Sequence, residues 1–243
     1  MTQPMNCPGT VRSHVWLYKP LPDGDPAVRV EHGNGPAGLP FHRFGTGDER
    51  LVIVPGVMDS LGWNTPGALT AHLLARYYFH RLREFDVWVL SRPPGLLAGI
   101  TAEKMAEQYA DALDELGPAH ILGFSLGGAI GSHVAANRPD LVDRLILAGA
   151  AHRLGSYGET IMARWQELAE RQEWASLHVD YSQTVYAGSR RIIIPPLYRL
   201  GARLLPEPES RGDVSSFHQS SPVSRRTNGA TRRRGTDARA RRA

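Results

Sequence analysis

Hydrophobic residues in the first two thirds of the chain form four short runs, separated by longer segments with helical periodicity. The runs occupy residues 51–54, 87–90, 120–122 and 145–148. A short apolar run bounded by turn residues is typical of a strand that is covered on both faces. Strands that alternate with helices build βαβ units with right-handed crossovers. We therefore predict an α/β fold with a mostly parallel sheet flanked by helices.

The segments between these runs carry helix start and stop signals. Thr65, followed by a proline at the first helical position, predicts a helix that extends to about residue 77. Thr101 is an expected N-cap, and Gly117 with the proline after it ends that helix. A third helix, rich in small residues, is expected from residue 126 to about residue 138. These helices are expected to cover the faces of the sheet.

The regions on either side of this alternating core differ from it in composition. Residues 1–38 are rich in Pro, Gly and Asp and are expected to form an irregular leader, with at most an edge strand near residues 28–30. The core itself spans residues 39–151. Residues 152–213 are expected to be mostly helical, with a break at residues 192–195. The chain is thus divided into a leader, a core, a helical region and a tail.

The tail, residues 214–243, is predicted to be disordered. After Phe217 there is no Leu, Ile, Met, Phe, Tyr or Trp, so this segment has too little apolar surface to offset its ordering entropy. Its last 26 residues carry eight arginines and one acid, whereas residues 1–217 carry 20 basic and 23 acidic residues. The sequence pI of about 9.4 therefore reflects the tail. Its arginines could bind nucleic-acid phosphates, but no aromatic residues accompany them, and a solvated or artefactual tail is the favoured interpretation.

Composition favours a cytoplasmic protein that does not enter a membrane. No apolar run approaches the ~18 residues that a membrane-spanning helix requires. The N-terminus lacks the basic start and apolar stretch of a secretory signal. The single cysteine, Cys7, cannot form an intrachain disulfide, which fits a reducing compartment.

The candidate chemistry is concentrated at residues 123–127, which read GFSLG and match G-x-S-x-G. The motif follows a predicted strand and opens a predicted helix, and this context makes it more specific than three fixed positions. A serine at such a sharp turn is raised above the sheet edge, where a base can reach its hydroxyl. The main-chain N–H of Leu126, at the start of the helix, would face a developing oxyanion. Ser125 is therefore the candidate nucleophile.

Several ordered features make residues 39–151 resemble the α/β-hydrolase fold superfamily. Besides GFSLG, they are the Pro55-Gly56-Val57 loop after the first apolar run, Ser91-Arg92-Pro93 after the second, and the link at residues 137–147. The resemblance implies hydrolysis of a small ester, amide or related acyl substrate through Ser125, with no metal or organic cofactor. It also implies that Val57 N–H is the second oxyanion-hole donor, with Pro55 in place of the commoner His. The helical region after Ala151 would be a lid.

The resemblance does not extend to a complete catalytic triad. The family's acid and histidine follow later strands, whereas Asp213 follows no apolar run and both Asp237 and His218 lie in the tail. His152, just after the fourth run, is the remaining candidate for the base, although a local role at the hinge of the lid is preferred. We therefore hypothesise that the chain is truncated or frameshifted after about residue 217, and that its activity is impaired.

Alternative interpretations remain open at this level. The chain could be a non-catalytic relative that binds a ligand or a partner under its lid, or the motif could occur by chance in another α/β protein. Among the other histidines, His32 and His42 are assigned to the leader and an early strand, His133 to a packing or surface position and His178 to the lid. No histidine pair has the H-E-x-x-H spacing of a zinc site. Neither G-x-G-x-x-G nor a P-loop motif occurs, so nucleotide binding is not expected. The sequence makes no prediction of oligomeric state.

Overall fold

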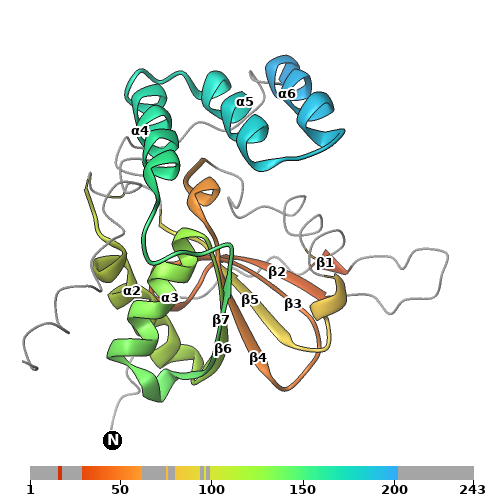
Figure 1. The fold of residues 1–243 in the computed structure, drawn as a ribbon. Coiled ribbons are helices and arrows are strands. Elements are labelled where there is room, and N and C mark those ends of the chain that lie inside the picture. The colour runs from red at the N-terminus through yellow and green to blue at the C-terminus, as the bar shows by residue number, and fades with distance from the viewer. Residues whose placement is uncertain are drawn as a thin grey trace, which may run out of the picture.

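A computed structural model describes residues 16–17, 29–61, 75, 80–93, 96 and 99–201. They contain a seven-stranded sheet with the order β1-β2-β3-β5-β4-β6-β7 (Figure 1). The expectation of at most one edge strand in the leader is wrong, because residues 16–17 and 29–34 both form strands and the second pairs on both sides. The other leader residues lie largely outside the described part. The strands are β1 (Trp16–Leu17), β2 (Arg29–Asn34), β3 (Pro40–Phe44), β4 (Arg50–Val54), β5 (Asp86–Leu90), β6 (Ala119–Phe124) and β7 (Val142–Ala148).

The parallel part of the sheet is formed by the four strands that the apolar runs predict. β4 pairs in parallel with both β5 and β6, and β6 pairs in parallel with β7. The strands β1 to β3 extend the β5 edge by antiparallel pairing. Because β2 is antiparallel to β3, it runs in the same direction as the parallel four. The predicted α/β fold with a mostly parallel sheet is confirmed.

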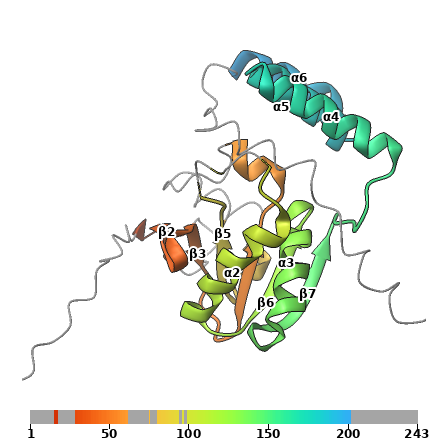
Figure 2. The same ribbon diagram turned by 90° about the vertical axis from the view of Figure 1, so that its left-hand side faces the viewer.

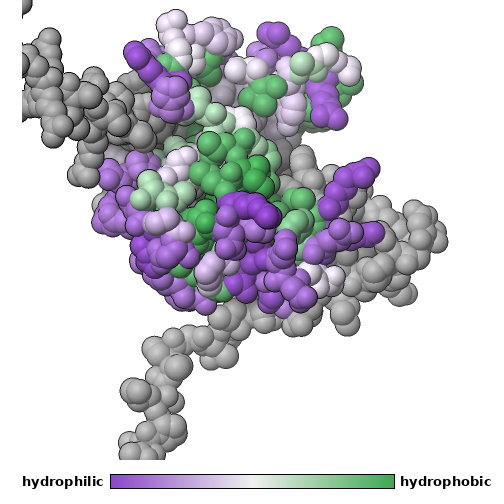
Figure 3. Space-filling model, turned by 60° about the horizontal axis from the view of Figure 1, so that its bottom comes forward, coloured by the Kyte–Doolittle hydropathy of each residue, from purple (hydrophilic) through white to green (hydrophobic). Residues whose placement is uncertain are grey.

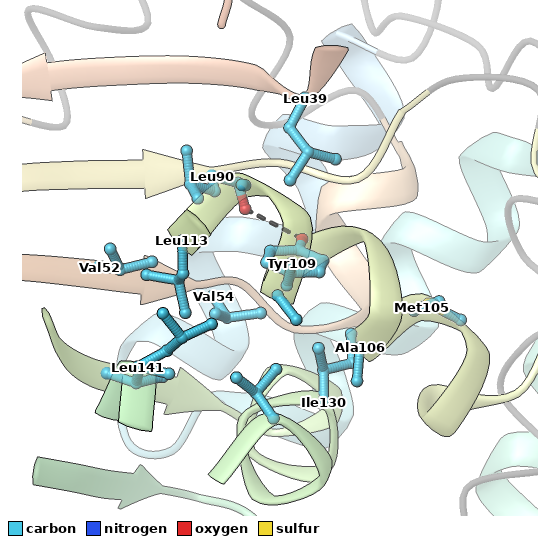
Figure 4. Close-up of a cluster of buried hydrophobic side chains, with 14 of the residues drawn as sticks. Leu39, Val52, Val54, Leu90, Met105, Ala106, Tyr109, Leu113, Ile130 and Leu141 are labelled. Atoms are coloured by element: carbon cyan, nitrogen blue, oxygen red, sulfur yellow. Dashed lines mark hydrogen bonds between the residues drawn. The ribbon is translucent and has the colours of Figure 1, made fainter. Parts of the chain in front are cut away.

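Two helices, α2 (Ala102–Leu116) and α3 (Leu126–Asn137), cover one face of the sheet (Figure 2). The predicted start and stop of α2 are confirmed, because Thr101 Oγ1 accepts a hydrogen bond from Lys104 N at 3.1 Å and Gly117 adopts a φ of 88°. The buried side chains between these helices and the sheet form the main core (Figure 4). The helix expected from Thr65 lies outside the described residues except at Ala75.

A buried carboxylate anchors the start of β5. Asp86 accepts hydrogen bonds from Arg43 Nε at 2.7 Å and from Trp88 Nε1 at 3.0 Å, and Arg50 Nε lies 3.4 Å away. Burial alone would raise the pKa of Asp86, but its hydrogen bonds to Arg43 and Trp88 and the nearby positive charges lower it overall. Asp86 therefore joins β3, β4 and β5 at the end of the sheet opposite the carboxyl ends of the parallel strands.

Three further helices lie across the carboxyl end of the parallel strands (Figure 2). They are α4 (Ser156–Glu170), α5 (Trp174–Val185) and α6 (Arg190–Gly201). The expected break at residues 192–195 is wrong, because α6 continues through Pro195 and Pro196. Pro195 and Tyr198 form the buried face of α6, so tertiary packing outweighs the main-chain hydrogen bonds that the prolines cannot make.

The described end of the sheet at β7 leaves apolar side chains exposed. Ile146 is 47% exposed, Leu147 51% and Phe124 at the end of β6 40%. Hydrophobic residues also gather in the middle of the face that Figure 3 shows, surrounded by hydrophilic ones. No helix among the described residues has both the length and the apolarity needed to cross a membrane.

Candidate functional site

Ser125 occupies a strained turn between β6 and α3. Its φ of 50° and ψ of −115° are unusual for a residue with a side chain. Such a conformation costs of order 1–3 kcal/mol and persists only when the surroundings enforce it. Here Ser125 N donates to Ala148 O at 3.0 Å, and Ser125 O accepts from Gly128 N at 2.9 Å. The side chain of Ser125 is exposed, as the motif predicts for a residue on a sharp turn.

The glycines of the G-x-S-x-G motif allow the turn to pack closely. A Cβ atom on Gly123 would lie 2.6 Å from Gly127 O, inside the distance that real Cβ atoms tolerate. A Cβ atom on Gly127 would overlap the carbonyl oxygen of Val54, the last residue of β4. The first turn of α3 is thus pressed against the end of the neighbouring strand. Larger residues at these two positions would move Ser125.

The loop after β4 lies directly against Ser125. A Cβ atom on Gly56 would lie 3.1 Å from Ser125 Cβ and 3.8 Å from Ser125 Oγ. Val57 follows Gly56 and begins the 3-10 helix η2 (Val57–Leu61). Ser125 is therefore adjacent in sequence to Leu126 and in contact with the residue before Val57. The structure thus places the loop that contains Val57 next to Ser125.

Sequence reasoning missed a buried ion pair beside this loop. Asp59 in η2 and Arg92, which follows β5, have side chains that are only 1% and 2% exposed, with 3.9 Å between Asp59 Oδ2 and Arg92 Nε. Arg92 N donates to Asp59 Oδ2 at 2.6 Å. Arg92 Nη2 donates to Gly56 O at 2.9 Å and lies 3.3 Å from Val57 O. The available signal was a charged residue, Arg92, two positions after the end of a buried strand.

The helices above the sheet contact the same loop. Ile161, Trp165 and Leu177 of α4 and α5 belong to a buried cluster, against which Val57 and Met58 pack. Trp165 Nε1 also donates to Asp180 Oδ2 at 2.7 Å, which ties α4 to α5. The loop beside Ser125 therefore contacts both the end of the sheet and this helical layer.

The histidines are distributed over several parts of the fold. His152 is exposed and follows the end of β7, the strand whose Ala148 O holds Ser125 N. His133 is half-buried on α3. His178 in α5 is buried and stacks on Tyr198, with 5.4 Å between ring centroids, and burial lowers its pKa to about 4. His32 and His42 face each other across β2 and β3.

The acids and the histidine that were considered for the triad beyond residue 201 have no described position, and the described residues form no metal site. Asp213, His218 and Asp237 lie outside the described residues. The expected arginine-rich tail also lies outside them. Within the part of the chain that is described, no three His, Cys, Asp or Glu side chains are grouped as a metal site requires.

Comparison with solved structures shows the same fold in several hydrolases. A 2-hydroxy-6-oxo-6-phenylhexa-2,4-dienoate hydrolase from Rhodococcus sp. strain RHA1 is 16% identical, with a TM-score of 0.53 over 82% of this chain and 73% of that one. A thermophilic esterase from Thermogutta terrifontis is 18% identical, with a TM-score of 0.51 over 86% and 73%. An N-formylmaleamic acid deformylase from Pseudomonas putida S16 is 21% identical, with a TM-score of 0.51 over 80% and 74%.

Comparison of sequences gives the family. Among curated proteins, none matches this chain. The family model described as "alpha/beta hydrolase fold" matches residues 51–189, which is more than half of the chain. This range includes the loop after β4, the turn at Ser125 and helices α4 and α5. The chain belongs to the α/β-hydrolase fold family.

Proposed function

We propose that the protein is a serine hydrolase, in which Ser125 attacks the carbonyl carbon of a small ester, amide or related acyl substrate. The observation that carries the proposal is the positive φ of Ser125 at the β6–α3 turn. A strained backbone at an exposed serine has a physical reason if the strain holds the hydroxyl in an attacking position. The similar structures are named for different substrates, so the proposal is made at the level of the substrate class.

In this proposal the main-chain N–H groups of Val57 and Leu126 form the oxyanion hole. Leu126 is the first residue of α3, where N–H groups lack partners within the helix and the helix dipole favours negative charge. Gly56 lies against Ser125, and we propose that the next peptide N–H, that of Val57, points toward the same side. Each donor would stabilise the transition state by about 2.7–4 kcal/mol.

The base and the lid belong to the same proposal. His152 is the candidate base, because it follows the strand end that holds Ser125 N. His152 is exposed, so its ring is oriented less firmly than that of a histidine held by a buried acid. We therefore propose that the rate of hydrolysis is impaired. The helices α4 to α6 would serve as the lid over the substrate, with residues 39–151 as the catalytic core.

Labelling with a fluorophosphonate tests this function directly. The probe reacts with an activated serine, and peptide mapping by mass spectrometry should place the adduct on Ser125. Ser125→Ala should remove the label, whereas Ser132→Ala, which changes a serine of α3 that donates to Gly128 O, should keep it. A wild-type protein that is folded but unlabelled, or labelled elsewhere, would contradict the proposal.

A non-catalytic, ligand-binding protein is the second candidate, and the exposure of His152 favours it. It predicts that small acyl compounds bind and protect the loop at Val57 from hydrogen exchange, while no product forms over hours. Turnover that depends on Ser125 would exclude this candidate.

A further inference from the structure

The side chain of Arg92 forms a buried bridge between the end of β5 and the loop that lies against Ser125. Its Nη2 donates to the carbonyl oxygen of Gly56 at 2.9 Å and approaches that of Val57 at 3.3 Å. Its own main-chain N–H donates to Asp59 Oδ2 at 2.6 Å. A guanidinium that is 2% exposed and faces two carbonyl oxygens fixes the orientation of the peptide planes that carry them.

One of these planes contains the N–H of Val57. In a trans peptide the carbonyl oxygen of one residue and the N–H of the next point in opposite directions. Because Arg92 holds Gly56 O, the N–H of Val57 points away from Arg92. Ser125 lies against this peptide, since a Cβ atom on Gly56 would be 3.1 Å from Ser125 Cβ. The bond to Arg92 therefore controls the direction of the donor.

The position of Arg92 is itself fixed from two sides. Tyr109 in α2 is buried, and its hydroxyl donates to Leu90 O, at the end of β5, at 3.0 Å (Figure 4). Ser91 N donates to Pro40 O at 2.8 Å. Asp59, which accepts from Arg92 N, also donates its own N–H to Gly56 O at 3.1 Å. The loop and the strand end are thus locked to each other.

We propose that Arg92 and Asp59 are positioning residues, which hold the Val57 N–H toward the oxyanion that forms at Ser125. The inference rests on the proposed serine-hydrolase function and adds to it two side chains that act through the loop at Gly56 and Val57. Burying an ion pair is often no better for stability than burying apolar side chains of similar volume. Stability alone therefore does not explain the buried pair, whereas the fixed orientation of the loop at Gly56 and Val57 does.

Three variants separate positioning from mere stability. Arg92→Lys keeps the charge but cannot reproduce the planar fork. Arg92→Met leaves Asp59 buried without its cation, so it should lower the melting temperature. The double variant Asp59→Leu with Arg92→Met removes both charges and should recover much of that melting temperature. Arg43→Lys is the matched control, because Arg43 pairs with Asp86 by a side-chain bond of 2.7 Å at the opposite end of the strands.

The rates of Ser125 phosphonylation and of p-nitrophenyl acetate hydrolysis are the readouts, measured below the melting temperature of every variant. We expect kcat to fall about 10- to 1000-fold in Arg92→Lys and in the double variant, with KM changed much less, since removal of an oxyanion donor lowers kcat by ~10²–10³. Arg43→Lys should keep the wild-type rate. Faster hydrogen exchange at Val57 in Arg92→Lys, relative to α2, should accompany the loss.

The outcomes distinguish the inference from the function on which it rests. A double variant that is as stable as wild type and reacts as fast would overturn the positioning role and leave the serine hydrolase intact. Wild-type protein that is never phosphonylated at Ser125 would overturn the proposed function instead. A rate that falls only in proportion to the folded fraction, and recovers in the double variant, would also overturn the positioning role.

Discussion

The main-chain N–H of Ser125 donates a hydrogen bond to the carbonyl oxygen of Ala148, with 3.0 Å between nitrogen and oxygen. Ala148 is the last residue of β7, so this strand end holds the turn in its strained conformation. Because the strain lies in one residue, a substitution at that residue can measure the free energy that the strain costs.

Ser125→Gly is expected to stabilise the protein while it removes phosphonate labelling. Glycine adopts a positive φ without the steric cost that a Cβ atom brings, and relief of that cost should raise the free energy of unfolding by about 1 kcal/mol. Urea denaturation measures this change. Ser132→Gly is the control of opposite sign, because glycine inside α3 should lower stability by about 0.5–1 kcal/mol. Equal destabilisation by both variants would show that Ser125 is not strained.

Gly127→Ala is expected to destabilise the fold by about 1–3 kcal/mol or more, because its methyl group would overlap Val54 O. Gly155→Ala is the matched control, since a Cβ atom on Gly155 would have no heavy atom within 4 Å and Gly155 has a φ of −79°. Thermal unfolding followed by circular dichroism compares the two variants. If Gly127→Ala has the same melting temperature as Gly155→Ala and keeps its labelling rate, the prediction that α3 packs too closely on β4 for a methyl group would be contradicted.

The strands of the parallel core could be predicted because each is a short apolar run between turn residues. Arg29–Asn34 could not be predicted in full, since its sequence RVEHGN has one large apolar residue, and pairing with β3 makes it a strand. The continuation of α6 through Pro195 and Pro196 could not be predicted, because the low helix propensity of proline is outweighed by the packing of this helix. The α/β-hydrolase resemblance, by contrast, was carried by motifs whose spacing the fold preserves.

Part of the candidate site could likewise be predicted from the sequence, and part could not. The strained turn at Ser125 and the start of α3 at Leu126 could be predicted, because the motif, the strand and the helix are contiguous in sequence. Asp59 and Arg92 are 33 residues apart and share no local pattern, and they meet because β4 and β5 pair in parallel, which places the segments after the two strands side by side. A buried polar group that is satisfied across the fold leaves little trace in a single sequence.

Stability is expected to fall as the pH is lowered from about 6.5 to about 4, because of His178. Burial lowers the pKa of His178 from 6.5 to about 4. Between these values the unfolded chain binds a proton that the folded chain does not, so the free energy of unfolding decreases with decreasing pH. We expect a loss of about 1 kcal/mol by about pH 5, with allowance for solvent screening.

The test compares wild type with His178→Phe, which keeps a ring to stack on Tyr198. Urea unfolding at several pH values should give a shallower dependence for the variant between about pH 6.5 and 4. Identical slopes for the two proteins would assign the acid sensitivity to other groups.

Tyr109→Phe should lower the free energy of unfolding by about 1–3 kcal/mol, because it leaves Leu90 O buried without its donor at 3.0 Å. Burial raises the pKa of this hydroxyl, with Asp59 adding to the rise and Arg92 opposing it, so the tyrosine remains a donor at all ordinary pH values. Urea denaturation measures the loss. Phenylalanine at Tyr109 with unchanged stability would show that this hydrogen bond contributes nothing net.

His152→Ala tests the candidate base. If His152 accepts the proton of Ser125, its removal should lower the rate of ester hydrolysis by about 10²–10⁴-fold, the usual contribution of general acid–base catalysis. Imidazole added to the buffer should restore part of the rate, since the deleted ring leaves an exposed position that a small base can reach. His133→Ala, on the half-buried side of α3, should keep the wild-type rate.

The alternative role of His152 gives a different pattern. A histidine that only shapes the connection between β7 and α4 would change the melting temperature or the protease sensitivity of residues 149–155, and the hydrolysis rate per folded molecule would stay constant. Imidazole would then have no effect on the rate. Because added imidazole cannot repair a displaced loop but can supply a missing base, rescue separates proton transfer from structure at this position.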